Sequence, residues 1–172
     1  MKLETNLSKS LIEKFDLLKK RCLLVIEQLN ENELVWQPNN ESNSIANLSL
    51  HIRETVRYRV ESLYSEIVVE RERNNEFETG LILSKTEIVT HVTESFVILK
   101  KLVQDLSEEE LLEKPYLNNN TLSHSAMNKD ATVLDVCLQM LAHLSEHVGQ
   151  IFYIVKLIKS DQYITTTFPK KR

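Results

Sequence analysis

Apolar residues recur every three or four positions through Val133-Leu-Asp-Val-Cys-Leu-Gln-Met-Leu-Ala-His143-Leu-Ser-Glu-His147-Val-Gly-Gln-Ile-Phe-Tyr-Ile-Val-Lys-Leu-Ile158. This period is that of one face of an α-helix, so it predicts a long helix that begins near Asp130 or Thr132. Glycine occurs only twice and proline only three times in the chain. So few turn-forming residues do not suit a sandwich, a barrel or a doubly wound sheet, and long helices are the natural alternative.

Three further segments show the same helical spacing of apolar residues, over residues 5–30, 45–63 and 84–106. The third of these begins with the capping-box spacing, and the same signature at Ser107 opens a short segment that Pro115 ends. The sequence therefore predicts an all-α fold, a four-helix bundle with a short extra helix near residues 107–114. A length of 172 residues suits one domain, covering residues 1–172.

The second long helix has Ser42 or Asn43 as its expected N-cap, and its apolar stripe passes through Arg59 or Val60 and ends at Leu63. A highly charged segment follows and ends near Gly80. Four arginines in this part of the chain could bind an anion, but glutamates surround them, which favours mutual ion pairing on a solvated face. The arginines are Arg57, Arg59, Arg71 and Arg73, and the glutamates are Glu54, Glu61, Glu70, Glu72 and Glu76.

The overall composition excludes several classes of protein. A net charge of −4 argues against a nucleic-acid-binding surface, which needs a clustered basic excess. The N-terminus lacks the apolar core of a signal peptide, and no run approaches the roughly 18 apolar residues that span a bilayer. Cys22 and Cys137 lie in apolar-periodic segments and are expected to be small buried hydrophobes. We therefore expect a cytoplasmic protein.

Histidines provide the main candidate for chemistry. His143 and His147 are four residues apart on the apolar face of the last helix, which places their Cβ atoms roughly 5–6 Å apart. His51 lies at the border of the apolar stripe of the second long helix. Three imidazoles could supply three of the four positions of a tetrahedral metal and leave one open for water or substrate. Alternatively, these histidines are satisfied core residues, because the spacing alone does not show that His51 lies opposite the pair.

Other candidates are weaker. His91 lies one position off the stripe of the third long helix and His124 lies in a polar loop, so we expect surface or supporting roles for both. The motif His143-x-x-Glu146-His147 also matches the inverted zinc-protease pattern, which needs an acidic ligand well downstream. Only Asp161 is acidic after the motif, and Glu146 lies roughly 100° around the helix from His147. A peptidase is therefore not favoured.

Three groups of residues carry a resemblance to a known family. They are Trp36-x-Pro38, the stretch Asn43-Ser-Ile-Ala-Asn-Leu-Ser-Leu-His51, and the later motif His143-x-x-x-His147-x-Gly149-Gln150-Ile151. Together they resemble the DinB/YfiT-like superfamily of metalloenzymes, in which a Trp-Pro segment leads to a helix with one histidine and a His-x-x-x-His-x-Gly-Gln helix supplies two more. The likeness runs from about residue 5 to 169 and is strongest to one bacterial branch.

The resemblance implies a four-helix bundle, often a homodimer, that binds a divalent metal such as zinc or nickel through His51, His143 and His147. Better-understood relatives are thiol-dependent enzymes that use bacillithiol, mycothiol or glutathione. We therefore expect a metal-dependent transferase that moves a low-molecular-weight thiol to a small electrophilic substrate. The alternative is a non-catalytic bundle in which the metal is structural or the domain binds a partner. Gly149 is expected to let a neighbouring helix or a ligand approach the backbone beside the site, and Gln150 to hydrogen-bond a ligand or substrate.

Overall fold

The structure is a computed structural model, and it describes residues 6–63, 70–116 and 130–166. The described residues form α1 (Asn6–Ile26), α2 (Ile45–Arg59), α3 (Arg73–Glu76), α4 (Lys85–Asp105), α5 (Glu108–Glu113) and α6 (Val133–Lys159). Short 3₁₀ helices follow α1 (Glu31–Glu33), α2 (Glu61–Leu63) and α6 (Ser160–Gln162). Within these ranges the β-type pairing is limited to one isolated bridge, between Pro115 and Thr132. The predicted all-α fold with a short extra helix is confirmed, and α5 is that helix.

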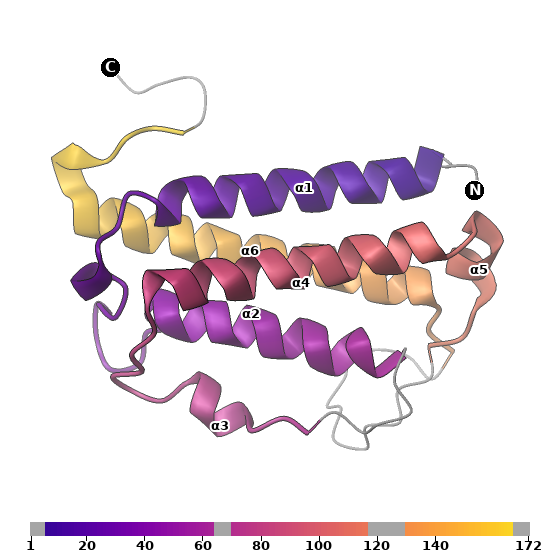
Figure 1. The fold of residues 1–172 in the computed structure, drawn as a ribbon, viewed down its shortest axis with the longest axis horizontal. Coiled ribbons are helices and arrows are strands. Elements are labelled where there is room, and N and C mark those ends of the chain that lie inside the picture. Colours follow the sequence, from indigo (N-terminus) through magenta and orange to yellow (C-terminus); the bar gives the residue numbers. More distant parts are fainter. Residues whose placement is uncertain (1–5, 64–69, 117–129, 167–172) are drawn as a thin grey trace.

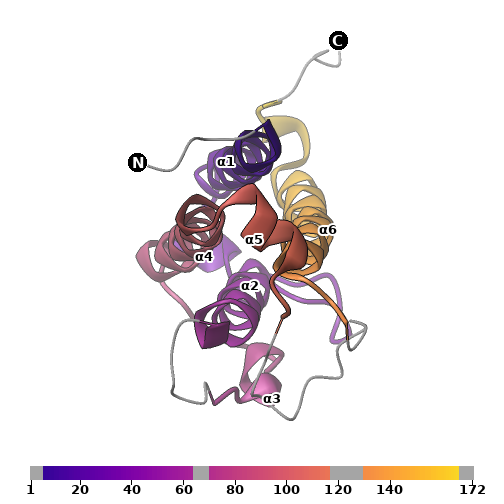
Figure 2. The same cartoon turned by 90° about the vertical axis from the view of Figure 1, so that its right-hand side faces the viewer.

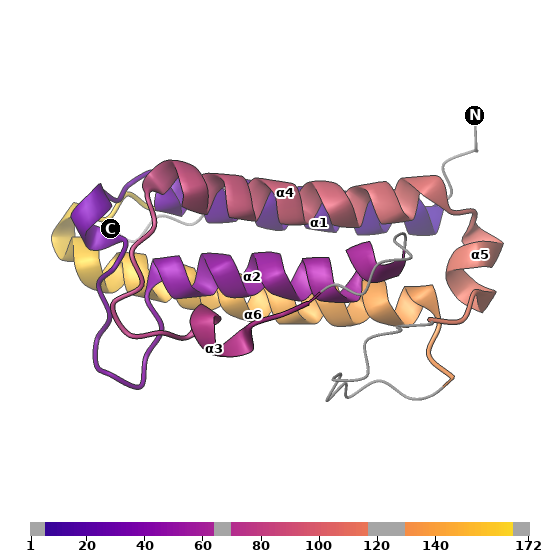
Figure 3. The same cartoon turned by 60° about the horizontal axis from the view of Figure 1, so that its bottom comes forward.

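Four long helices make the bundle. α1 packs against α4 and α6, and α2 packs against the same two helices, so the four stand at the corners of a square (Figure 2). α2 and α4 run in the same direction, because the connection between them, which contains α3, returns along the outside of α2 (Figure 1). α6 runs antiparallel to α2, and the two lie side by side (Figure 3). The arrangement therefore brings the second and last long helices of the sequence together.

The core consists of the apolar stripes that the sequence predicts. Phe15 of α1 and Phe96 of α4 are fully buried and their ring centroids lie 6.5 Å apart. Cys22 and Cys137 are buried thiols, as expected for small hydrophobes. Each long helix keeps charged residues on its outer face, and no helix in the described part of the chain is long and apolar enough to cross a membrane.

Side-chain caps fix where most of the helices begin. Capping boxes at Ser84, Ser107 and Thr132 open α4, α5 and α6, in which the cap oxygen accepts from a backbone N–H that has no partner within its helix. The N-cap of α2 is Ser44, so the expected cap at Ser42 or Asn43 is wrong by one or two residues. Ser44 takes this position because the Asn47 side chain accepts a hydrogen bond from its backbone N–H.

Candidate metal centre

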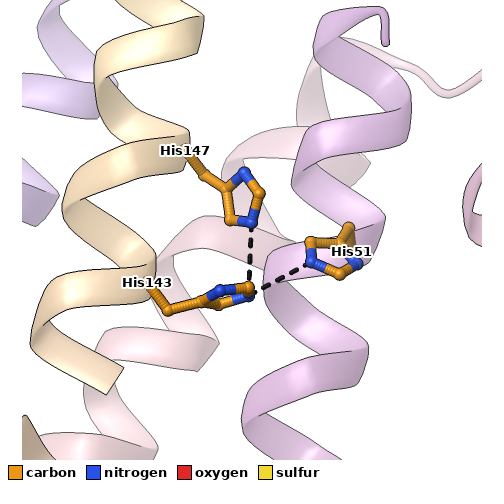
Figure 4. Close-up of side chains that lie close together, drawn as sticks. All are labelled: His51, His143 and His147. Atoms are coloured by element: carbon orange, nitrogen blue, oxygen red, sulfur yellow. Dashed lines mark hydrogen bonds between the residues drawn. The ribbon is translucent and has the colours of Figure 1, made fainter. Parts of the chain in front are cut away.

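Three imidazoles meet between α2 and α6. His143 and His147 are one turn apart on α6, and His51 faces them from α2 (Figure 4). The Nε2 atom of His143 lies 3.1 Å from Nε2 of His51 and 3.2 Å from Nε2 of His147. One nitrogen from each ring lies within 4.8 Å of the other two, and such a group could hold a metal ion. The fold therefore places His51 opposite the pair, which the sequence alone does not show.

The hydrogen bonds of Nδ1 in His51 and in His147 determine which ring nitrogens of the cluster carry a hydrogen. Nδ1 of His51 lies 2.8 Å from the Glu76 carboxylate, and Nδ1 of His147 lies 3.0 Å from Oε1 of Gln150. Both partners are acceptors, so each Nδ1 donates, and in the neutral ring the Nε2 atom then presents a lone pair. Both lone pairs face Nε2 of His143, which carries at most one hydrogen. A cation at the centre would satisfy the lone pairs that remain.

Burial keeps the imidazoles of α6 in the neutral form that binds metals. Burial, together with the nearby His147, His51, Arg59 and Arg71, lowers the pKa of His143 to about 3. Burial also lowers the pKa of His147, and the hydrogen bond to Gln150 opposes that effect. Near neutral pH neither ring of this pair therefore carries the second proton of the imidazolium form, which a metal would have to displace.

Two of the three separations between the ring nitrogens suit a tetrahedral ion. Nitrogens that lie about 2.0–2.1 Å from one ion lie roughly 3.3–3.4 Å from one another, and the two distances above are close to this value. Three nitrogen ligands leave the fourth tetrahedral position for water or a substrate atom. The three imidazoles therefore form a donor set that could hold a metal ion.

A buried carboxylate orients His51. Glu76, at the end of α3, is 1% exposed and accepts from His51 and from Nε and Nη2 of Arg71, at 2.6 and 2.7 Å. Arg71 Nη2 also donates to Oγ1 of Thr55, one turn after His51 on α2. Burial by itself would raise the pKa of Glu76, but the hydrogen bonds from Arg71 and His51 hold it below its usual value. Such carboxylate partners fix the tautomer and orientation of a metal-binding histidine.

Asn47 holds the segment that carries Glu76. Its side-chain amide donates to the backbone carbonyls of Glu76 and Glu78 at 3.1 and 3.0 Å, while its carbonyl oxygen accepts from Ser44. The same residue thus starts α2 and anchors α3 against it. The Phe77 ring then lies 5.0 Å from the His51 ring, centroid to centroid, and covers one side of the site.

A groove of about 800 Å³ lies between α6 and residues 38–43; its described lining includes none of the three histidines, and Gln150 links it to His147. Leu48, Tyr153, Ile154 and Leu157 give it an apolar wall, and Gln150, the partner of His147, also lines it. Glu41 and Glu146 stand at the same groove. It is large enough for a small organic substrate.

The other candidate residues have varied surroundings. His91 is half-buried on α4, outside the three-histidine cluster, and burial lowers its pKa. His124 lies outside the described residues. Glu146 is exposed and lines the groove, outside the three-histidine cluster. Nothing lies within 4 Å of a Cβ added at Gly149, so the expected close approach of another element is not found, and the residue borders the groove instead.

The expectation that the arginines and glutamates pair on a solvated face is correct for only part of the set. Arg57 pairs with Glu54 and Glu61 at the surface. It is wrong for Arg71 and Glu76, because the connection after α2 folds back and buries this pair against His51. A spacing of five residues is not a helical contact, so the sequence offers no local signal for it. The general rule that a metal-binding histidine has a carboxylate or carbonyl partner is the one signal that could have pointed to Glu76.

Comparison with known proteins places the chain by its fold and family. The comparison with curated proteins finds no match. A solved structure titled "Crystal structure of the conserved protein of locus from Enterococcus faecalis" is similar with a TM-score of 0.70 and 15% identity, over 92% of this chain and 98% of that chain. At this identity the likeness shows the fold alone. The family described as "Protein of unknown function (DUF1572)" matches residues 3–172, and the chain therefore belongs to this family.

Proposed function

We propose that this protein is a divalent-metal-dependent enzyme of the DinB/YfiT-like superfamily, and that its metal ligands are His51, His143 and His147. One observation carries the proposal: three Nε2 atoms converge although at most one of them carries a hydrogen. Zinc or nickel suits three neutral imidazoles. The proposed reaction transfers a low-molecular-weight thiol to a small electrophilic substrate.

The residues around the site have separable roles in such a reaction. When bound, the metal would lower the pKa of a coordinated thiol or water to near neutral and so supply a nucleophile. Glu76 holds the proton on Nδ1 of His51, and Gln150 orients His147 in the same way. Phe77 excludes water from one side of His51. The apolar groove beside Gln150 would bind the electrophile.

The first test measures metal in protein purified without a histidine tag and without added metal. We expect about one equivalent of a divalent transition metal in the unaltered protein. His51→Ala should lose most of it, because two imidazoles from one helix make a weak site. His91→Ala is the matched control, since it removes a half-buried histidine that lies outside the cluster. Absence of metal affinity in the unaltered protein, even after dialysis against zinc or nickel, would overturn the proposal.

The second test separates an enzyme from a bundle in which metal is only structural. Metal-loaded and metal-free protein are assayed with thiols such as bacillithiol and glutathione against a panel of electrophiles. We expect conjugation that needs the metal, and a metal-free protein that stays folded, because the apolar core supports α2 and α6 without it. Stripping that strongly lowers the melting temperature, with no conjugation before or after, would favour the structural alternative.

The proposed partners are a small-molecule substrate and a second copy of the chain, as a homodimer. We propose no nucleic-acid partner, because acidic residues outnumber basic ones in the chain, 25 to 21. Light scattering on the eluate of a size-exclusion column measures the dimer directly. A mass close to 20.0 kDa, that of one chain, would contradict it.

A further inference from the structure

Arg59 has an unusual position for an arginine of α2. It is the last residue of that helix, and its guanidinium donates to Oε1 of Gln139 on α6. The hydroxyl of Tyr116 donates to its backbone carbonyl at 3.1 Å and so fixes the end of the helix. Arg59 is part-buried, and its charged end therefore lies between α2 and α6 rather than on the outer face of the bundle.

The contact between Arg59 and Gln139 continues the face that carries the histidines. His51, Thr55 and Arg59 are each four residues apart, and so are Gln139, His143 and His147, so each set shares one side of its helix. Because α2 and α6 are antiparallel, the two sets meet along one seam. Arg59 lies about 12 Å beyond His51 along α2, and Gln139 about 6 Å from His143 along α6. Side chains lean toward the start of their helix, which brings the guanidinium back toward His51.

The three arginines of α2 differ in how their charges are balanced. Arg53 pairs with Glu54 and Glu94, and Arg57 pairs with Glu54 and Glu61. Arg59 forms no ion pair with any carboxylate among residues 6–63, 70–116 and 130–166, and an uncharged amide is its side-chain partner there. A guanidinium has five N–H donors in a planar fork, so most of its donor capacity faces no anion of the described chain.

Positive charge accumulates at this end of the seam. Burial lowers the pKa of Arg59, Tyr116 and Tyr58 oppose that effect, and the nearby charges of Arg71 and Arg73 add to it. Glu76 balances Arg71. Arg73 lies 5.7 Å from the centroid of Phe77, the ring that covers His51. The charge of Arg59 is one of those that lower the pKa of His143, so it acts near the three histidines without a carboxylate partner in the described chain, an arrangement that attracts anions.

We propose that Arg59 binds the carboxylate or phosphate group of a small reactant whose other end reaches the three-histidine site. The planar fork of a guanidinium matches both groups, with two parallel hydrogen bonds. The separation of one to two helical turns requires a reactant several bonds long, rather than a simple oxyanion. The identity of the reacting end rests on the proposed function, but the contact between Arg59 and the anion needs no metal.

The first experiment uses the full-length, metal-free protein at low salt. Glutarate and inorganic phosphate are titrated separately, and binding is followed by protein NMR or calorimetry. Arg59→Gln should weaken binding about tenfold or more, because it removes a charge-assisted pair. Arg57→Gln is the matched control, since it removes an arginine two residues away that already has two carboxylate partners. The tighter of the two anions identifies the class of reactant.

A second variant keeps the arginine and the fold. Gln139→Glu supplies an internal carboxylate at the atom that Arg59 already contacts, so it should abolish binding of the external anion without unfolding the protein. Unchanged binding in Arg59→Gln or in Gln139→Glu would overturn the proposal. A wild-type protein that binds neither glutarate nor phosphate would overturn it as well.

A third arm separates this proposal from the proposed function. Zinc-loaded protein is titrated with 5-mercaptopentanoate and with 5-mercaptopentanol, which differ in the acid group alone. The acid should bind about tenfold more tightly, and Arg59→Gln should remove that difference while Arg57→Gln keeps it. His51→Ala should lose the metal but still bind glutarate. If the protein binds no metal, the test of anion binding by Arg59 still stands. If Arg59→Gln does not change anion binding, the test of the metal site still stands.

Discussion

The contact between α1 and α4 and the contact between α2 and α6 are built from different residues. Phe15 and Phe96 meet in a dry, fully buried pair between α1 and α4. Between α2 and α6 the facing side chains include imidazoles and the Arg59–Gln139 contact. Polar groups in an interior cost free energy unless they are hydrogen-bonded, so a stable bundle has no need of them. The difference indicates that one contact stabilises the fold while the other carries the chemistry.

The largest effect should come from emptying the apolar contact. Phe96→Ala removes a fully buried ring and leaves a cavity beside Phe15, so the free energy of unfolding should fall by about 3–5 kcal/mol. Chemical denaturation measures it. The folded fraction should still bind one equivalent of metal, because His51, His143 and His147 lie between the other two helices.

The neighbouring residue on α4 supplies the control. Val97 is 52% exposed, so Val97→Ala should change the free energy of unfolding by less than about 0.5 kcal/mol. If Phe96→Ala lost metal while it remained folded, the separation between a stabilising contact and a functional contact would not hold.

The second effect concerns the buried carboxylate behind His51. Glu76→Ala leaves the Arg71 guanidinium, 12% exposed, without its ion pair, and should cost about 3 kcal/mol of stability. It also removes the acceptor for Nδ1 of His51, so zinc affinity should fall about 10- to 100-fold. Competition with a chelating dye measures the affinity. Glu72→Ala changes an exposed carboxylate of the same segment and should leave the affinity unaltered.

The two expected losses in Glu76→Ala come from different contacts, and a second variant separates them. Arg71→Met removes the cation but keeps the carboxylate beside His51. It should therefore lower the free energy of unfolding, as Glu76→Ala does, but lower the zinc affinity less than Glu76→Ala does. Equal zinc affinity in Glu76→Ala and in the unaltered protein would contradict a positioning role for Glu76.

The third effect depends on pH and distinguishes the polar contact from the apolar one. The pKa of His143 is about 3 in the folded protein and about 6.5 in the unfolded chain. Between these values the unfolded chain binds a proton that the folded protein does not, so the stability of metal-free protein should fall as the pH drops below 6.5. The pKa of Glu76 is also lowered, and its contribution is lost only below the ordinary carboxyl range.

Denaturation of metal-free protein at pH 7.5 and at pH 5 measures this dependence. His143→Gln should reduce the difference between the two pH values, because it removes one of the groups that titrate. Phe96→Ala should lower stability at both pH values by the same amount, since it changes no ionisable group. An undiminished pH dependence in His143→Gln would show that the proton uptake occurs elsewhere.

Much of the apolar architecture could be predicted, because its signals are local. The capping boxes at Ser84 and Ser107 mark the starts of α4 and α5, and the spacing of apolar residues identifies the faces that are buried. His143 and His147 are also a local signal, since four residues of helix place them on one face. His51 could be joined to them only through the resemblance to a known family.

The supporting residues of the site could not be predicted, because they depend on how a long connection folds back. Glu76 lies in a charged segment that suggests a solvated face, yet Asn47 anchors this segment on α2 and buries the carboxylate. Arg57 and Arg59 are two residues apart and look alike in the sequence. Which of them meets a glutamate and which meets α6 depends on the packing of two helices distant in the chain.

The smallest expected effect is that of Gly149→Ala, which tests whether the groove along α6 is open to solvent. Gly149 lies within α6, where glycine weakens a helix, and nothing lies within 4 Å of an added Cβ. Gly149→Ala should therefore raise the free energy of unfolding by about 0.5–1 kcal/mol, measured by chemical denaturation. Gly80→Ala should act oppositely, because Gly80 has a φ of +80°, a conformation that alanine resists.

Metal and substrate measurements on Gly149→Ala then show what the groove is for. The variant should bind zinc as the unaltered protein does, because Gly149 lines the groove and lies about 160° around α6 from His147. If the groove holds the electrophile, the added methyl group should raise KM without lowering metal content. A destabilised variant would mean that another element or chain closes over α6 at this point, and the groove would then be an interface instead of a substrate site.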